Sequence, residues 1–210
     1  MPIKISFNLA IILLLTSVTL LQGCGGMLVG GAALVAHDRR DSQTIVADQG
    51  IESSATDKLY SELGKKIHIN VTSYNRVVLL TGEVLSHDTR EQAVNIVRNI
   101  PNVRRVHNEL VVDDLTSFKS RSHDTWITSK VKSSLVGAKG LDSTYVKVIT
   151  ENDAVYLMGL VTENEADLAV DVARNVEDVD RVVKLFEYVP EPVPEPQPPS
   201  QPGTATGQSS

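Results

Sequence analysis

The chain has 210 residues, enough for one ordinary domain or two small ones once an export signal is removed. Its formal net charge of −6 argues against nucleic acid as a partner, because nucleic-acid binding calls for clustered lysine and arginine. Aromatic residues make up only 4% of the chain, so the core must be mainly aliphatic and an exposed aromatic side chain is informative.

Residues 1–23 have the order of a secretory signal. Lys4 is the only charged residue of the run from residue 3 to residue 21, and the small Gly23 precedes Cys24. The sequence Leu21-Gln22-Gly23-Cys24 resembles the lipobox of bacterial lipoproteins, in which a peptidase cuts before the cysteine and the new amino-terminal cysteine carries acyl chains. The resemblance predicts acylation of Cys24. The next residue is Gly25 rather than aspartate, and by resemblance to the sorting pattern of such lipoproteins this implies export to the outer membrane, facing the periplasm.

Two other interpretations of this segment stay open. The apolar run approaches the roughly 20 residues that span a bilayer, so it could be an uncleaved transmembrane helix. Cys24 could also be an ordinary buried thiol. It is the only cysteine of the chain, which excludes an intramolecular disulfide and favours an attachment point.

Residues 24–44 are expected to form a glycine-rich leash between the acyl anchor and the folded part. Four glycines between residues 25 and 31 disfavour a helix, and the apolar stretch that contains them is too short to cross a membrane. It either links the two parts flexibly or lies against the lipid surface. The charged residues 38–41 mark the emergence of the chain into water.

The body of the chain is a duplication. Residues 75–84 align with 152–161, and, with one residue fewer in the second copy, residues 93–100 align with 169–176. Each unit covers about 65 residues, too long for a solenoid repeat, so the sequence indicates two small domains. We place them at residues 45–114 and 124–189, with a linker at 115–123.

Each copy begins with an expected helix and a hairpin. The helix carries one stripe of apolar residues four apart, namely Ile51, Ala55, Leu59 and Leu63 in the first copy and Ile127, Val131 and Leu135 in the second. Two β-rich runs then pair across a turn, 68–73 with 77–81 and 145–150 with 154–158. Gly82 and Gly159 are expected to end the second strand where the chain turns sharply.

A second helix and a last strand complete each copy. Ser86 or Asp88 caps the helix of the first copy, which Pro101 stops, and Thr162 with Glu165 forms a capping box in the second. The last strand, 103–112 or 179–189, returns parallel beside the hairpin. The predicted fold class is therefore α+β, with two tandem αββαβ domains, each a three-stranded mixed sheet packed against two helices on one face.

Two tandem αββαβ units with a glycine after the second strand, behind a lipobox, resemble BON domains over residues 45–189. The runs 124–131, 150–152 and 157–163 strengthen the resemblance. The BON family is associated with phospholipid interaction and envelope integrity rather than catalysis, and the resemblance implies that role here. The tail, residues 190–210, holds seven of the nine prolines and is expected to be disordered.

The only tryptophan is the candidate lipid contact. On a helix Trp126 falls roughly 140° from the centre of the apolar stripe, and its helical neighbours are Ser129, Lys130 and Ser133. Tryptophan beside lysine on an exposed helix suits the headgroup boundary of a membrane. The predicted lipid-binding residues are Trp126, Lys130, Lys132, Ser133 and Lys139.

The first copy has Gly50 and Ser54 at the positions of Trp126 and Lys130, so only the second domain carries this feature. Trp126 could instead cap its own core or pack against the first domain. Residues 124–189 hold twelve acidic and seven basic residues, so lipid binding requires a local lysine patch with the acids of the second helix pointing elsewhere.

The functional hypothesis is an outer-membrane lipoprotein that binds anionic phospholipid, such as phosphatidylglycerol, through the second domain. The alternative is a periplasmic scaffold that binds envelope proteins through exposed sheet edges or the Trp126 surface. The basic residues of the first copy, Arg76, Arg104 and Arg105, are expected at a solvated edge or at the interface between the domains.

The sequence contains no recognisable catalytic or cofactor motif. The five histidines have neither cysteine partners nor H-x-x-x-H spacing, which predicts no metal site. A Gly-x-Ser-x-Gly elbow, a P-loop and a dinucleotide fingerprint are also missing from the sequence. We therefore expect no cofactor and no enzymatic activity.

The lipobox generates the first prediction. Mass spectrometry of the protein isolated from membranes should find the mature amino terminus at Cys24, with the mass of attached acyl chains. Each buried methylene of an acyl chain contributes roughly 0.8 kcal/mol to membrane binding. A single chain therefore binds only marginally, and stable anchoring takes two chains. An unmodified amino terminus would contradict the anchor.

Overall fold

The computed structural model describes residues 38–115 and 118–191. The predicted signal segment, Cys24 and nearly all of the predicted disordered tail lie outside these residues. Within them, every helix is too short or too polar to cross a bilayer.

The first domain consists of two helices and one mixed sheet. Its elements in order are α3 Ser42–Leu63, β1 Ile67–Tyr74, β2 Val77–Val84, α4 His87–Arg98, β3 Arg105–Asn108 and β4 Val111–Val112. Strand β1 pairs antiparallel with β2, and β3 and β4 both pair parallel with β2. The last strand predicted at 103–112 is thus confirmed in direction and divided in two.

The second domain repeats this plan. Its elements are α5 Phe118–Val136, the short 3₁₀ helix η2 Ser143–Tyr145, β5 Val146–Glu151, β6 Ala154–Val161, α6 Glu163–Arg174 and β7 Arg181–Tyr188. Strand β6 lies between antiparallel β5 and parallel β7. The α+β class and the αββαβ order predicted from the sequence are confirmed.

The predicted helical stripes form the cores of the two domains. Ile51, Ala55 and Leu59 are buried against the first sheet, and Ile127, Val131 and Leu135 against the second. Ser86 accepts a hydrogen bond from the backbone N–H of Thr89 and caps α4, while Thr162 and Glu165 form the predicted capping box of α6.

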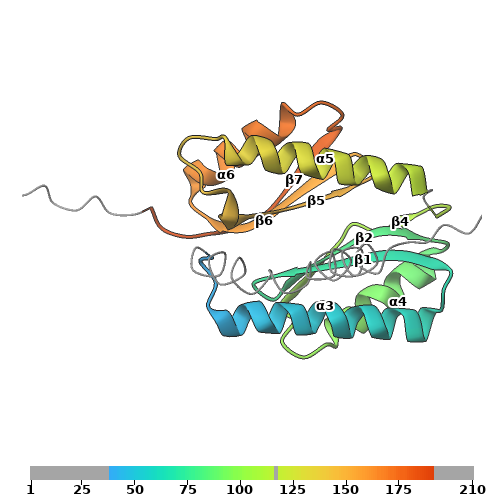
Figure 1. The fold of residues 1–210 in the computed structure, drawn as a ribbon. Helices are drawn as coiled ribbons and strands as arrows, with labels where there is room; N and C mark the ends of the chain where they lie inside the picture. Colours follow the sequence, from blue (N-terminus) through green and yellow to red (C-terminus); the bar gives the residue numbers. More distant parts are fainter. Residues whose placement is uncertain (1–37, 116–117, 192–210) are drawn as a thin grey trace, which may run out of the picture.

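The two sheets pack against each other through the faces that the helices leave bare (Figure 1). The apolar cluster between them contains Tyr74, Val77 and Leu79 from the first domain and Tyr156 and Met158 from the second, each at most 4% exposed. We call this interface the seam. It makes β2 and β6 buried on both faces and gives four layers, with α3 and α4 outside one sheet and α5 and α6 outside the other.

The prediction that Gly82 and Gly159 end their strands is wrong, because both glycines lie inside β2 and β6. Their role is a close approach between strands. A Cβ on Gly82 would lie 2.0 Å from the carbonyl oxygen of His68, and one on Gly159 would lie 2.3 Å from that of Tyr145. Gly82 also has φ +107°, which other residues rarely adopt.

Two expected boundaries also differ. Helix α3 begins at Ser42, inside the expected leash, because the Asp41 carboxylate accepts a hydrogen bond from the backbone N–H of Thr44 and caps it. Helix α5 begins at Phe118, inside the expected linker, because residues 118–123 contain neither proline nor glycine to stop it.

A buried aspartate in the first helix of each domain holds the hairpin turn. Asp48 accepts hydrogen bonds from the backbone N–H groups of Asn75 and Arg76, at 2.8 and 2.7 Å. Asp124 does the same for residues 152 and 153, at 3.1 and 3.0 Å. The central turn residues have positive φ, as a type I′ hairpin requires.

The close approach at Gly82 generates the second prediction. Replacing it, Gly82→Ala, should lower the free energy of unfolding by about 3 kcal/mol, since the new methyl group meets backbone and φ is strained. The matched control is Gly50→Ala in helix α3, where nothing lies within 4 Å of the added Cβ. It should raise stability by about 0.5–1 kcal/mol. Urea denaturation measures the free energy of unfolding of each variant. Equal changes for Gly82→Ala and Gly50→Ala would contradict this role of Gly82.

Candidate membrane-contact site

Among residues 120–136, the part of α5 whose side chains the structure describes, the outward face carries two exposed apolar side chains. Trp126 is 58% exposed and Val136 is 73% exposed, so the predicted exposure of Trp126 is confirmed. At about 100° per residue they lie on either side of Ser129 and Ser133, opposite the buried stripe. We call Trp126, Ser129, Ser133 and Val136 the α5 ridge. It is roughly 15 Å long, from the helical rise per residue.

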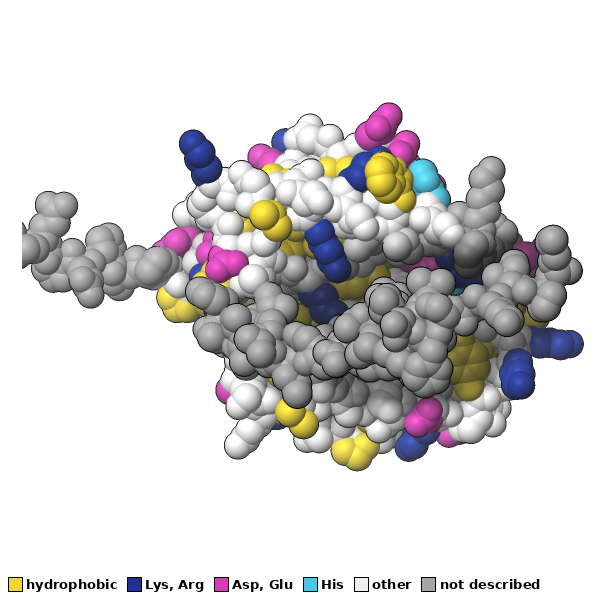
Figure 2. Space-filling model, in the orientation of Figure 1, with side chains coloured by type: hydrophobic (Ala, Val, Ile, Leu, Met, Phe, Trp, Pro, Cys, Tyr) yellow, Lys and Arg dark blue, Asp and Glu magenta, His cyan; other side chains and the backbone are white. Residues whose placement is uncertain are grey.

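The ridge has small polar side chains between its two apolar ends. Figure 2 shows this upper face, where hydrophobic, basic and acidic side chains stand close together over α5. Because serines project little from a helix, the indole and the valine are the groups that would meet a surface first. A half-exposed indole flanked by polar groups suits the headgroup boundary of a bilayer.

Lys130 lies beside the indole but is not a free cation. Its Nζ donates hydrogen bonds to a carboxylate oxygen of Asp178 at 2.9 Å and to the backbone oxygen of Glu177 at 2.8 Å. The same Nζ lies 5.6 Å from the centre of the Trp126 ring. The ion pair lowers the pKa of the Asp178 carboxyl, chiefly through the hydrogen bond from Lys130. Glu177 and Asp178 lie just beyond the end of α6, so they are not among the helix acids that were expected to point elsewhere, but they place negative charge beside Lys130.

The other predicted lysines stand apart from the indole. Lys132 is exposed on the opposite flank of α5, where it lines a shallow groove with Val136 and Thr144. Lys139 is exposed in the loop after the helix, and Ser133 lies on the ridge itself. The structure thus brings Trp126, Lys130 and Ser133 around one groove and places Lys132 and Lys139 outside it.

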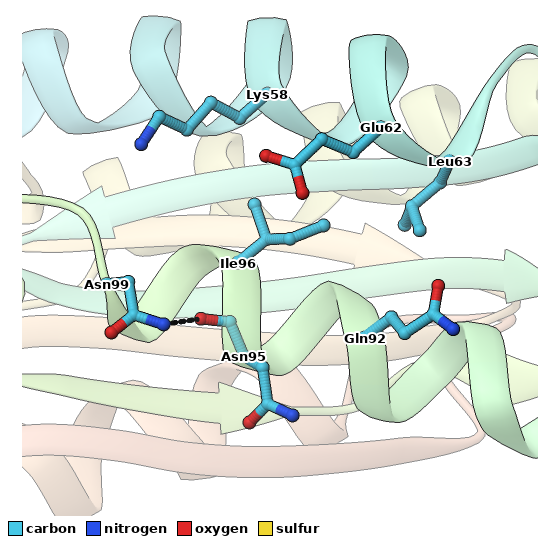
Figure 3. Close-up of a pocket in the computed structure, with 7 residues that line it drawn as sticks. All are labelled: Lys58, Glu62, Leu63, Gln92, Asn95, Ile96 and Asn99. Carbon is cyan, nitrogen blue, oxygen red and sulfur yellow. Dashed lines mark hydrogen bonds between the residues drawn. The ribbon is translucent and has the colours of Figure 1, made fainter.

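The groove beside Trp126 has a volume of about 460 Å³ and runs between α5 and the end of α6. It is lined by Trp126, Ser129, Lys130, Ser133, Ser134, Asn175, Val176 and Glu177. The first domain has its own groove between α3 and α4, and its lining side chains include Lys58, Glu62 and several amides but no aromatic residue (Figure 3). The exposed indole is therefore particular to the second domain.

The segment before α3 contacts both domains, which the sequence analysis did not predict. The Arg39 guanidinium makes two hydrogen bonds to the Glu165 carboxylate, at 2.6 and 2.9 Å, and lies over the Tyr145 ring at 3.9 Å. The Arg40 guanidinium binds Asp48 at 2.7 Å and lies over Tyr74. Residues 38–41 are therefore docked against both domains and do not simply lead the chain into water.

The seam contains charged and polar contacts in addition to its apolar cluster. Arg104 forms an ion pair with Glu187, which also accepts a hydrogen bond from Asn75 at 2.6 Å. Arg104 therefore lies at the interface that the sequence offered as one alternative. His68, Glu83 and Glu151 form the one group of described residues whose donor atoms converge closely enough to hold a metal ion.

Comparison with known proteins places these features in a family context. The family model described as BON domain matches residues 48–114 and 123–190. The chain is 36% identical to the outer membrane lipoprotein DolP of Haemophilus influenzae, over 84% of this chain and 94% of that protein. It is also 36% identical to the 21 kDa hemolysin of Actinobacillus pleuropneumoniae, over 72% and 79%. The osmotically-inducible protein Y of Escherichia coli is 33% identical over 56% and 60%.

The Arg39 contact generates the third prediction. Burial opposes ionisation of Glu165, but the hydrogen bonds from Arg39 and from the backbone of Thr162 outweigh it and lower the pKa of this carboxyl. A lowered folded-state pKa stabilises the fold above the unfolded pKa, and this contribution is lost as pH falls through the folded value. Arg39→Met should therefore reduce the free energy of unfolding at pH 7 by about 1–2 kcal/mol, and by much less at pH 3.

Urea denaturation at the two pH values measures the effect. The matched control is Arg174→Met, since the pair formed by Arg174 and Asp171 is exposed and one helical turn apart. That variant should change stability by a few tenths of a kcal/mol. Equal stability of Arg39→Met and the unchanged protein at pH 7 would contradict the docking of this segment.

Proposed function

The chain belongs to the BON-domain family, and on that premise we propose that it is an outer-membrane lipoprotein that binds anionic phospholipid through the α5 ridge of its second domain. Acyl chains on Cys24 hold it at the membrane, facing the periplasm, and the lipid contact supports envelope integrity. The observation that carries the proposal is the 58% exposure of Trp126, the only tryptophan, on an outer helix. The relation to the outer membrane lipoprotein of Haemophilus influenzae supports the location.

The charge distribution indicates how the contact works. Lys130 already pairs with Asp178, so the net attraction that it offers to lipid phosphate is reduced. Lys132 and Lys139 are exposed, and each contributes roughly 1 kcal/mol near an anionic surface. The indole supplies the apolar part of the binding free energy. The contact is therefore weak and depends on both tryptophan and salt.

A weak contact is sufficient because the anchor keeps the protein near the surface. The fourteen residues from Cys24 to His37 can reach at most about 50 Å, at roughly 3.5 Å per residue. Within that reach the second contact is effectively intramolecular, and its local concentration is high. Arg39, which follows this segment, binds Glu165 of the second domain, the domain that carries the ridge.

One observation favours the scaffold alternative. Leu85 and Val111 of the first domain and Leu115 directly after it are 40–51% exposed and lie at or just beyond the ends of β2 and β4. Exposed apolar side chains in one region are typical of protein contacts. A photo-crosslinker at position 85 in whole envelopes tests this function, since capture of one defined envelope protein favours the scaffold.

The lipid proposal generates the fourth prediction. Non-acylated mature chain, made with Cys24→Ser and without the signal segment, should co-sediment with phosphatidylglycerol vesicles. The additional change Trp126→Ala should weaken this binding about tenfold, equivalent to roughly 1.4 kcal/mol. Raising the salt concentration should weaken the binding of the unchanged ridge further.

The matched control is Tyr60→Ala, since Tyr60 is 40% exposed on the corresponding outer helix of the first domain. It should leave vesicle binding unchanged. Vesicles of phosphatidylcholine test the requirement for negative charge. Binding that is absent, or equal in the Trp126 and Tyr60 variants, refutes a lipid contact at the α5 ridge.

A further inference from the structure

Three metal-ligand side chains meet at the seam. His68 comes from β1 and Glu83 from β2 of the first domain, whereas Glu151 ends β5 of the second. Their ligand atoms all lie within 4.8 Å of one another. His68 Nδ1 is 2.8 Å from Glu83 Oε2 and 4.0 Å from Glu151 Oε1. Packing of the two domains therefore brings one nitrogen and two oxygen ligands close together.

The remaining oxygen of each carboxylate is held by a neutral donor. Glu83 Oε1 accepts a hydrogen bond from Asn152 Nδ2 at 2.7 Å. Glu151 Oε2 accepts from Asn70 Nδ2 at 2.7 Å and from Thr81 Oγ1 at 3.0 Å. These bonds orient Glu83 Oε2 and Glu151 Oε1 toward the imidazole. Metal-binding carboxylates are held by outer partners in the same way.

The two carboxylates of the cluster are buried. Glu83 is 1% exposed and Glu151 is 6% exposed. A divalent cation coordinated by the imidazole and both carboxylates would compensate buried negative charge, and metal coordination is one way in which proteins tolerate such charge.

We propose that His68, Glu83 and Glu151 bind a divalent transition-metal ion of the Zn²⁺ type at the seam. Imidazole with two carboxylates suits zinc, whereas magnesium and calcium prefer sets made of oxygen alone. Ligands of a tetrahedral zinc ion at about 2.1 Å lie about 3.4 Å apart, and the separations of 2.8 and 4.0 Å fall on either side of this value. Water completes the coordination.

Such an ion would join the two domains. Because two ligands come from one sheet and the third from the other, only the packed sheets offer the whole site. An ion that binds the folded state and not the unfolded chain stabilises it in proportion to its concentration. The concentration of free Zn²⁺ would thereby control the stability of the contact between the two domains.

The test uses the full chain, purified in detergent without a histidine tag and freed of metal with EDTA. Isothermal titration calorimetry should give one Zn²⁺ per chain, and Zn²⁺ but not Mg²⁺ should raise the thermal unfolding midpoint. Glu151→Gln keeps the shape and an acceptor oxygen for Asn70, and should weaken Zn²⁺ binding at least tenfold. The matched control is His123→Gln, since His123 and Asp153 form an exposed pair 3.6 Å apart. This control should bind as the unchanged chain does.

A second measurement avoids any folding defect of the variant. In the unchanged chain, NMR should find that Zn²⁺ shifts the imidazole nitrogen signals of His68 and leaves those of His123 in place. Zinc binding that is absent, that shifts His123 instead, or that is equal in Glu151→Gln and the unchanged chain overturns the proposal. The cluster would then be a hydrogen-bonded contact between the domains.

Discussion

The packing of the two sheets against each other is the interaction on which the rest of the structure depends. Each domain covers one face of its sheet with two helices, and the opposite faces meet at Tyr74, Leu79, Tyr156 and Met158. Domains of this size bury a modest share of their surface when they fold alone. The seam gives both sheets a second buried face, so the two units form one four-layered body with its helices outside (Figure 1).

This arrangement has a direct consequence for membrane contact. Helices are the outer layers of the body, and α5 is the outer helix with an exposed indole. Residues 38–41 before α3 are docked on the second domain through Arg39 and on the first domain through Arg40. In the proposed function, attachment through Cys24 raises the local concentration of the ridge at the membrane, so the weak contact depends on the anchor.

Much of the fold could be predicted because its signals are local. The stripes of Ile51 and Ile127, the capping box at Thr162 and the turn at Asn152 each depend on neighbouring residues. The exposure of Trp126 followed from helical periodicity. The two glycines were misassigned, because a glycine needed for close strand approach and one needed for a turn look alike in a sequence.

The features that could not be predicted depend on contacts between distant residues. The pairing of Lys130 with Asp178 joins residues 48 positions apart, and the His68 cluster draws on three strands of two domains. Motif spacing cannot identify such a group. One signal of the seam was present in the sequence. β6 is a nearly continuous apolar run and β2 begins with four successive apolar residues, as strands buried on both faces do, rather than alternating apolar and polar residues.

The single tryptophan allows the central claim, contact between the α5 ridge and lipid, to be measured without a substitution. Fluorescence of the full chain in vesicles of brominated phosphatidylglycerol reports the depth of Trp126 directly. The account predicts a blue-shifted emission that the bromines near the headgroups quench strongly. The account would be contradicted if the emission maximum stays at long wavelength, if the brominated lipids do not quench it, and if aqueous iodide does.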